Sequence, residues 1–212
     1  MKQKTVMCFG DSNTWGYPPD GSERYERSVR WPGVLQSELG EDFYVIEEGL
    51  CGRNTVWDDP IEGHKNGLKQ LVPLLHTHAP LDLIVIMLGT NDLKNRFSVS
   101  ALDIAWSVGR LVDTVKKSQI AYTGDVPQVL VVCPPPLADM SKSPFKDILI
   151  GAEEKSKQLS ETFKAYCCEN DIEMLDAGKV VVTSDVDGVH LDPEEHKKLG
   201  TAVAKKVREI LL

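Results

Sequence analysis

Hydroxyl, amide, carboxylate and imidazole side chains occur together in four short segments, residues 10–13, 49–54, 89–92 and 187–190. The first segment contains Ser12, which follows an apolar run almost directly. A serine at such a position is either the nucleophile of a catalytic site or the N-cap of a helix, and taken alone it is more often a cap. The evidence for one role or the other comes from the other three segments and from the helices and strands that position them.

Five apolar runs predict the strands of a sheet, and helical segments separate them. Three of the runs are rich in Val, Ile and Leu without clean alternation, which is typical of strands covered on both faces. The predicted strands are residues 5–10, 43–49, 81–89, 127–135 and 172–178. The predicted helices are residues 32–39, 63–78, 100–118, about 145–169, and 193–212.

This alternation predicts an α/β fold of the flavodoxin-like, three-layer type. We expect a five-stranded parallel sheet in the order 2-1-3-4-5 with helices on both faces. No linker, composition break or internal repeat divides the sequence, so residues 1–212 are expected to form a single domain. Ligands bind beyond the carboxyl ends of the strands in such folds. The four polar segments are therefore expected to converge on one edge of the sheet, which exceeds what helix capping requires.

The four segments resemble the sequence blocks of the SGNH hydrolase superfamily, also called GDSL-type esterases and lipases. Its blocks are a Ser in Gly-Asp-Ser, a Gly after the second strand, an Asn in Gly-x-Asn-Asp, and a late Asp-x-x-His pair. All four occur here in that order, between residues 10 and 190. The likeness is greatest to the arylesterase/acyltransferase subgroup, in CFGDSNTWGY, EEGLCGRNT, DLIVIMLGTNDLK, VLVVCPPPLADM and DAGKVVVTSDVDGVHLD. Each block alone is a weak signal, but the ordered set is specific.

The resemblance implies a serine mechanism with a role for each block. Ser12 would be the nucleophile, and His190 the base that takes its proton and later protonates the leaving group. Asp187 would orient the imidazole and stabilise its charged form. The oxyanion hole would consist of the backbone N–H groups of Ser12 and Gly52 and the side-chain amide of Asn91.

Further residues near these blocks are candidates for substrate contacts, each with a structural alternative. Asp11 either contacts substrate or accepts backbone N–H groups across its loop. Trp15, together with Tyr17, either borders an acyl or alcohol pocket or packs the excursion of residues 15–31 onto the body or onto a second subunit. Arg53 either steers an anionic group or pairs with one of the many acids. The sequence favours the structural role for Asp11 and does not choose between the two roles of the other residues.

The other histidines are expected to have no chemical role, because surface positions explain them. They are His64, His76, His78 and His196.

The composition excludes several classes of partner. The net charge is −8, and no basic cluster reverses it locally, so nucleic acid is not an expected partner. No window is long enough for a membrane span, and the N-terminal apolar run is too short for a signal peptide. The five cysteines are odd in number and scattered, without a CxxC pair, which favours a reducing, cytoplasmic setting.

The leading hypothesis is a serine esterase that hydrolyses short-chain carboxylic esters, acetyl or aryl, through an acyl-enzyme, with acyl transfer to alcohols as a further activity. It needs no cofactor and no metal, and its partner is a small ester. The subgroup resemblance and the 15–31 excursion suggest a homo-oligomer. Alternatives with the same triad are a carbohydrate O-deacetylase or a thioesterase. Metal-dependent phosphoryl chemistry and a non-catalytic flavodoxin-like binding module are more distant alternatives.

Overall fold

The computed structural model describes residues 3–118 and 126–212. Its strands are β1 (Lys4–Gly10), β2 (Phe43–Gly49), β3 (Leu83–Met87), β4 (Gln128–Cys133) and β5 (Glu173–Asp176). Its helices are α1 (Ser12–Trp15), α2 (Trp31–Leu39), α3 (Gly67–His78), α4 (Ala101–Lys117), α5 (Ala152–Glu169) and α6 (Pro193–Leu211). Short 3₁₀ helices are η1 (Asn91–Leu93), η2 (Asn95–Phe97) and η3 (Ala177–Lys179). The predicted strands and helices are all present, and α1 is added to them.

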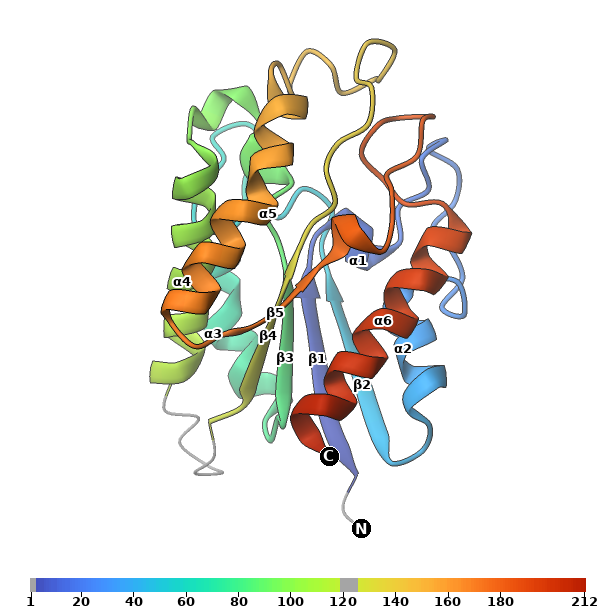
Figure 1. Cartoon of the computed structure of the whole chain (residues 1–212), viewed down its shortest axis with the longest axis vertical. Coiled ribbons are helices and arrows are strands. Elements are labelled where there is room, and N and C mark those ends of the chain that lie inside the picture. Colours follow the sequence, from blue (N-terminus) through green and yellow to red (C-terminus); the bar gives the residue numbers. More distant parts are fainter. Residues whose placement is uncertain (1–2, 119–125) are drawn as a thin grey trace.

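The strands form one parallel sheet in the order β2-β1-β3-β4-β5, which confirms the predicted topology. Strand β1 has a neighbour on each side, and its last residue, Gly10, lies opposite Gly49 of β2 and Met87 of β3. The segments that follow these three strands therefore start side by side at one edge of the sheet (Figure 1).

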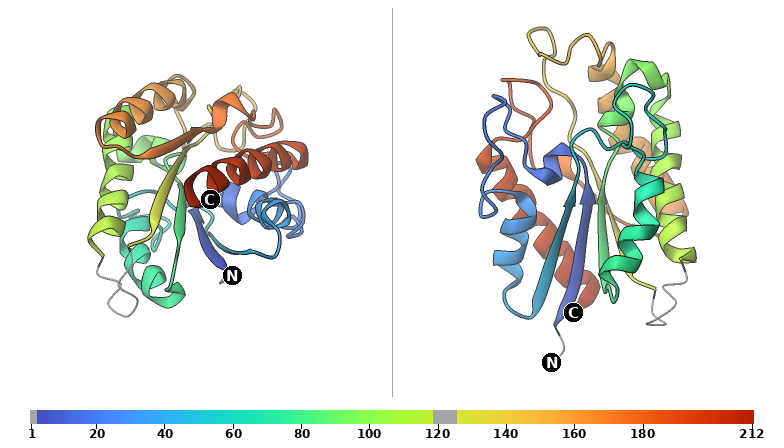
Figure 2. Two further views of the ribbon diagram at one scale, coloured as in Figure 1. Left: turned by 60° about the horizontal axis from the view of Figure 1, so that its bottom comes forward. Right: turned by 180° about the vertical axis from the view of Figure 1, so that it is seen from behind.

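Helices cover both faces of the sheet. Helices α2 and α6 lie on one face, and α3, α4 and α5 lie on the other (Figure 2). Successive residues of a strand point to opposite faces, so Val6 and Cys8 of β1 enter the core beneath α2 and α6. Met7 and Phe9 enter the core on the opposite face. Burial of both faces explains why the strands read as continuous apolar runs.

Two helices begin later in the chain than the sequence pattern predicted. Helix α5 begins at Ala152, because Gly151 has a φ of +70°, a left-handed conformation that favours glycine and does not continue a helix. Helix α3 begins at Gly67, after Asn66, whose side chain accepts a hydrogen bond from the N–H of Lys69 at 3.3 Å. The chain ahead of each helix is thereby free to reach the carboxyl edge of the sheet.

A glycine at the end of β2 lets α1 pack against the sheet. A Cβ on Gly49 would overlap backbone atoms of Thr14 and Trp15, so no larger residue fits there without a shift of α1. The same close packing fixes the first residue of α1, Ser12, at the carboxyl ends of β1 and β2.

The start of β1 and the end of α6 lie at the end of the molecule opposite the carboxyl edge of the sheet. Strand β1 begins and helix α6 ends at the lower end in Figure 1, whereas α1 lies at the upper end of the sheet. Within residues 3–118 and 126–212, no helix combines the length and the apolar composition that crossing a membrane requires.

Candidate active site

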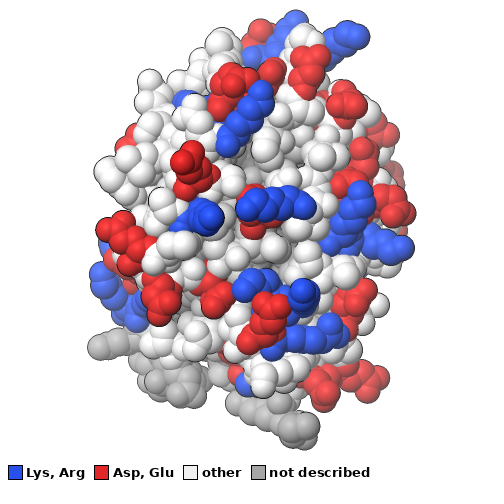
Figure 3. Space-filling model, viewed as in Figure 1, with Lys and Arg blue, Asp and Glu red and all other residues white. Residues whose placement is uncertain are grey.

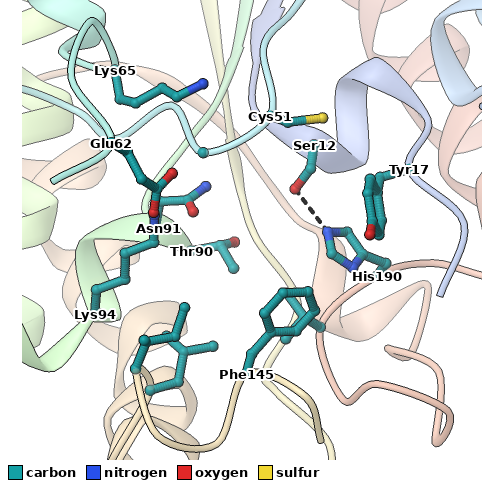
Figure 4. A pocket seen from close by; sticks show the side chains of 14 residues that line it. Ser12, Tyr17, Cys51, Glu62, Lys65, Thr90, Asn91, Lys94, Phe145 and His190 are labelled. Atoms are coloured by element: carbon teal, nitrogen blue, oxygen red, sulfur yellow. Dashed lines mark hydrogen bonds and ion pairs between the residues drawn. The ribbon is translucent and has the colours of Figure 1, made fainter. Parts of the chain in front are cut away.

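Ser12, His190 and Asp187 form a hydrogen-bonded chain at the carboxyl edge of the sheet. The His190 Nε2 atom lies 2.9 Å from Ser12 Oγ (Figure 4). The His190 Nδ1 atom lies 2.5 Å from Asp187 Oδ2. An ionised carboxylate only accepts hydrogen bonds, so Nδ1 carries the ring proton and Nε2 of the neutral ring accepts from the serine hydroxyl. The structure thus brings together the three residues that the sequence singled out for catalysis.

A tight turn holds the acid and the histidine together. Asp187 Oδ1 accepts hydrogen bonds from the backbone N–H groups of Val189 and His190, at 2.8 and 2.9 Å. Burial opposes ionisation of Asp187, but the hydrogen bonds from His190 and Val189 outweigh it, so the pKa of Asp187 lies below its usual 3.8. The carboxylate is therefore charged at neutral pH and can stabilise an imidazolium.

Asn13 joins this turn to the nucleophile segment. Its side chain donates to the carbonyl of Val189 at 3.2 Å and accepts from the N–H of Leu191 at 3.1 Å. Asn13 is next to Ser12 in α1, so the two bonds fix the histidine segment relative to the serine. This role was not predictable, because no local sequence signal indicates that Asn13 pairs with a segment about 180 residues away.

Aromatic side chains complete the surroundings of the His190 ring. The Tyr17 ring lies 4.5 Å from it between centroids, and the Phe145 ring packs edge-on at 5.7 Å. They come from the two long loops, residues 16–30 and 134–151, that the structure places over the carboxyl edge. Both rings limit the positions open to the imidazole and shield it from water.

Gly52 lines the same cavity as Ser12, and Asn91 lies on the opposite side of Ser12 from His190 (Figure 4). Gly52 follows β2 with a φ of +82°, a conformation that favours glycine, and a Cβ there would overlap the Glu62 carboxylate. The Asn91 side chain donates one amide hydrogen to the carbonyl of Arg53 at 3.1 Å. This bond fixes the orientation of the amide and leaves its second hydrogen for a ligand.

A second set of hydrogen bonds links the segment after β2 to the segment after β3. The buried Asp92 carboxylate accepts the backbone N–H of Thr55 at 3.1 and 3.2 Å and also accepts its hydroxyl. Burial raises the pKa of Asp92 to about 6, although the hydrogen bonds from Thr55 act in the opposite direction. The segment after β2 and the segment after β3 are thus held in register.

These residues border a cavity of about 250 Å³ with two unlike walls. The residues of the apolar wall are Tyr17, Phe145, Ile148, Leu149 and Val189. The residues of the polar wall are Cys51, Gly52, Glu62, Lys65, Thr90, Asn91 and Lys94, and Ser12 and His190 lie between the walls. Glu62, Lys65 and Lys94 were not expected in this cavity, because charged side chains of these types usually lie at the surface.

The described residues that line the cavity do not include the three candidate substrate contacts, Asp11, Trp15 and Arg53. Asp11 is buried and accepts the N–H of Asn13 at 3.0 Å as the N-cap of α1, and burial raises its pKa to about 6. Arg53 is buried, donates to the carbonyls of Gly10 and Glu48, and has its pKa lowered to about 10 by burial. The placement of Asp11 matches its structural alternative, whereas Arg53 binds backbone carbonyls and the Gln70 side chain rather than an acid.

Trp15 also lies beside the cavity rather than in its wall. The Arg24 guanidinium lies 4.5 Å from the centre of its ring and donates to its carbonyl at 2.7 Å. These contacts join two residues of the 15–31 excursion to each other.

His196 does not lie at the surface, contrary to the expectation for the histidines other than His190. It is fully buried in α6, accepts the N–H of Trp31 at 3.3 Å and packs against the edge of Tyr25. Burial lowers the pKa of His196 to about 4, so this imidazole is neutral at physiological pH. The apolar face of α6 simply includes one position occupied by a histidine.

The fold and the site are those of a family of hydrolases. The family model of the GDSL-like lipase/acylhydrolase family matches residues 8–198. The chain therefore belongs to this family, and it is a carboxylic ester hydrolase. A comparison with curated proteins gave no match.

Three solved structures similar to this chain are described as esterases. The aryl esterase of M. smegmatis is 44% identical with a TM-score of 0.94, and the match covers 98% of this chain and 100% of that one. Est24, a carbohydrate acetylesterase from Sinorhizobium meliloti, is 41% identical with a TM-score of 0.94, covering 99% and 100%. A putative arylesterase from Agrobacterium tumefaciens str. C58 is 38% identical with a TM-score of 0.90, covering 99% and 100%.

Proposed function

We propose that this chain hydrolyses short-chain carboxylic esters through an acyl-enzyme on Ser12, with His190 and Asp187 as the other members of a catalytic triad. The observation that carries the proposal is the pair of hydrogen bonds that joins Ser12 Oγ to His190 and His190 to Asp187. All three residues are at most 8% exposed, so an ester that reacts with them would be largely removed from bulk water.

The proposed reaction has two half-reactions. In the first, His190 Nε2 takes the proton of Ser12 as Oγ attacks the carbonyl carbon, and the imidazolium is stabilised by Asp187. The N–H groups of Ser12 and Gly52 and the Asn91 amide hold the negative oxygen. The intermediate collapses, the carbon–oxygen bond to the alcohol breaks, and His190 protonates the leaving oxygen. Water then repeats the sequence on the acyl-enzyme and releases the acid.

The substrate is proposed to be a small acetyl or aryl ester. The cavity of about 250 Å³ is smaller than the roughly 300–1,000 Å³ typical of ligand pockets. Its apolar wall suits an aromatic or short aliphatic group. Relatives described as aryl esterase and carbohydrate acetylesterase support both forms of the proposal, so a carbohydrate O-acetyl ester is the second candidate substrate.

Acyl transfer to an alcohol is proposed as a further activity of the same acyl-enzyme. Transfer competes with hydrolysis when an alcohol occupies the site and water is excluded. The rings of Tyr17 and Phe145 beside His190 favour an organic acceptor there. Measuring ethyl ester formation against acid release in aqueous ethanol tests this activity.

We also propose a homo-oligomer in a reducing, cytoplasmic setting. Leu102 and Trp106, one turn apart on α4, are 43% and 56% exposed and offer an apolar contact surface. The described part of the chain contains five free thiols, among them the exposed Cys168. Light scattering gives the mass of the assembly.

Both signs of charge are interspersed on the face shown in Figure 3, which fits a small ester better than a polyanion as partner.

Replacement of the nucleophile tests the proposed mechanism. Ser12→Ala is expected to abolish hydrolysis of p-nitrophenyl acetate and labelling by a fluorophosphonate, with an unchanged circular dichroism spectrum. The exposed Ser37→Ala on α2 is the matched control and should behave as the wild type. Full activity of the Ser12 variant would refute the triad. Absence of both activity and labelling in the wild-type protein would instead favour a non-catalytic binding module.

A further inference from the structure

Lys94 is a buried lysine in the wall of the cavity. It is 4% exposed and lies three residues after Asn91, just beyond η1. Its Nζ atom binds the Glu62 carboxylate and lies 4.0 Å from Asp59. Lysine is almost never fully buried without a partner, because desolvation of the ammonium is costly. The position is therefore maintained by the carboxylates around it.

Arg96 completes a four-charge network with this lysine. Its guanidinium lies 2.6 Å from Asp59 and 2.6 Å from Glu62. Two cations and two carboxylates balance, so the network offers no net charge to a substrate. It joins the loop after Gly52 to the segment after Asn91, and the Glu62 carboxylate lies where a Cβ on Gly52 would be.

The chemistry of the proposed triad decides which part of an ester faces this network. The leaving oxygen must face His190, which protonates it, and the carbonyl oxygen must face Gly52 and Asn91. The acyl substituent is then directed away from His190, toward the opposite side of the cavity. Figure 4 shows Thr90 and Lys94 on that side.

We propose that Lys94, anchored by Glu62, closes the acyl side of the cavity and restricts the enzyme to esters of short acyl chains. This inference rests on the proposed function. An acyl group of a few carbons fits in front of the ammonium. A longer chain would have to displace the buried ammonium of Lys94 from its carboxylates, and an unpaired buried charge is strongly disfavoured.

Lys94→Met tests the proposal with a side chain of similar length and no charge. Arg96 still pairs with Glu62 and Asp59 in this variant, so no carboxylate is left alone. The ratio of kcat/KM for p-nitrophenyl hexanoate to that for the acetate should rise roughly tenfold or more, since a methylene in a hydrophobic pocket is worth that much. Lys157→Met, which removes an exposed charge on α5, is the control and should leave the ratio unchanged.

Inhibition of the wild-type protein gives a second measurement, which is independent of how the variant folds. n-Alkylboronic acids form tetrahedral adducts with reactive serines, with the alkyl group in place of the acyl group. Their affinity should fall from ethyl to hexyl. A rise in affinity with chain length, or an unchanged ester ratio in folded Lys94→Met, would overturn the inference while acetate hydrolysis sensitive to Ser12→Ala still stands. If the wild type hydrolyses no ester, the proposed function and this inference fail together.

Discussion

Asp92 is fully buried behind the cavity, and Asp92→Asn is expected to change how stability depends on pH. Burial raises the pKa of this carboxyl group to about 6, and the nearby charge of Asp11 acts in the same direction. The hydrogen bonds from Thr55 reduce the shift but do not cancel it. The folded protein therefore holds a proton on Asp92 more tightly than the unfolded chain does, for which the pKa is near 3.9.

The sign and size of the effect follow from this difference. A raised pKa contributes stability that is complete below about pH 4 and is lost as the pH rises through 6. A shift of about two units corresponds to about 3 kcal/mol over the whole range. Between pH 5 and pH 7.5, a single group with these values loses roughly 1 kcal/mol of stability. The asparagine variant has no proton to lose at this position.

Urea unfolding at pH 5 and at pH 7.5 measures the effect. The free energy of unfolding of Asp92→Asn minus that of wild type should be roughly 1 kcal/mol higher at pH 7.5 than at pH 5. The variant also changes the bonds to Thr55, but that loss affects both pH values and cancels in the comparison. Asp147→Asn, at an exposed carboxyl group, is the control. If the free energies of unfolding of wild type and Asp92→Asn change equally between pH 5 and pH 7.5, the pKa of Asp92 is not raised in the folded protein.

Two further substitutions separate catalysis from packing. Asn91→Ala should lower kcat for p-nitrophenyl acetate about 10²–10³-fold, because one oxyanion donor is lost, with little change in Tm; a loss confined to KM would contradict that role. Phe163→Ala should cost about 3–5 kcal/mol in urea unfolding, because Phe163 of α5 is 1% exposed in the core; a cost under about 1 kcal/mol would mean that the site collapses around the missing ring.

The fold was predictable from the sequence because its signals are local and repeated. Apolar runs without alternation indicate strands covered on both faces, and right-handed crossovers leave few orders for such a sheet. Helix boundaries were less predictable. The late start of α5 depends on the left-handed conformation of Gly151, which a hydrophobic pattern does not record.

The candidate site was predictable to the extent that its residues follow strands. Ser12, Gly52 and Asn91 come after the three neighbouring strands β1, β2 and β3, so the topology alone brings them close. The wall of the cavity was not predictable in this way. Lys94 and Glu62 are 32 residues apart and meet through two irregular segments without periodicity.

The excursion after α1 illustrates the same limit. Trp15 and Tyr17 are equally plausible pocket residues by type, yet only Tyr17 is among the described residues that line the cavity. Gly16 between them has a φ of +87°, which turns the chain and directs the second ring toward His190. His196 shows the reverse case, since its polar type suggested the surface and its place on the apolar face of α6 buried it.

Strand β1 begins and helix α6 ends at the end of the molecule that lies away from the cavity (Figure 1). A linker attached at either chain end would therefore leave the protein with its cavity facing outward. The enzyme should tolerate attachment to a resin or a carrier without obstruction of ester entry. Attachment before β1 and attachment after α6 should serve equally well in a flow reactor.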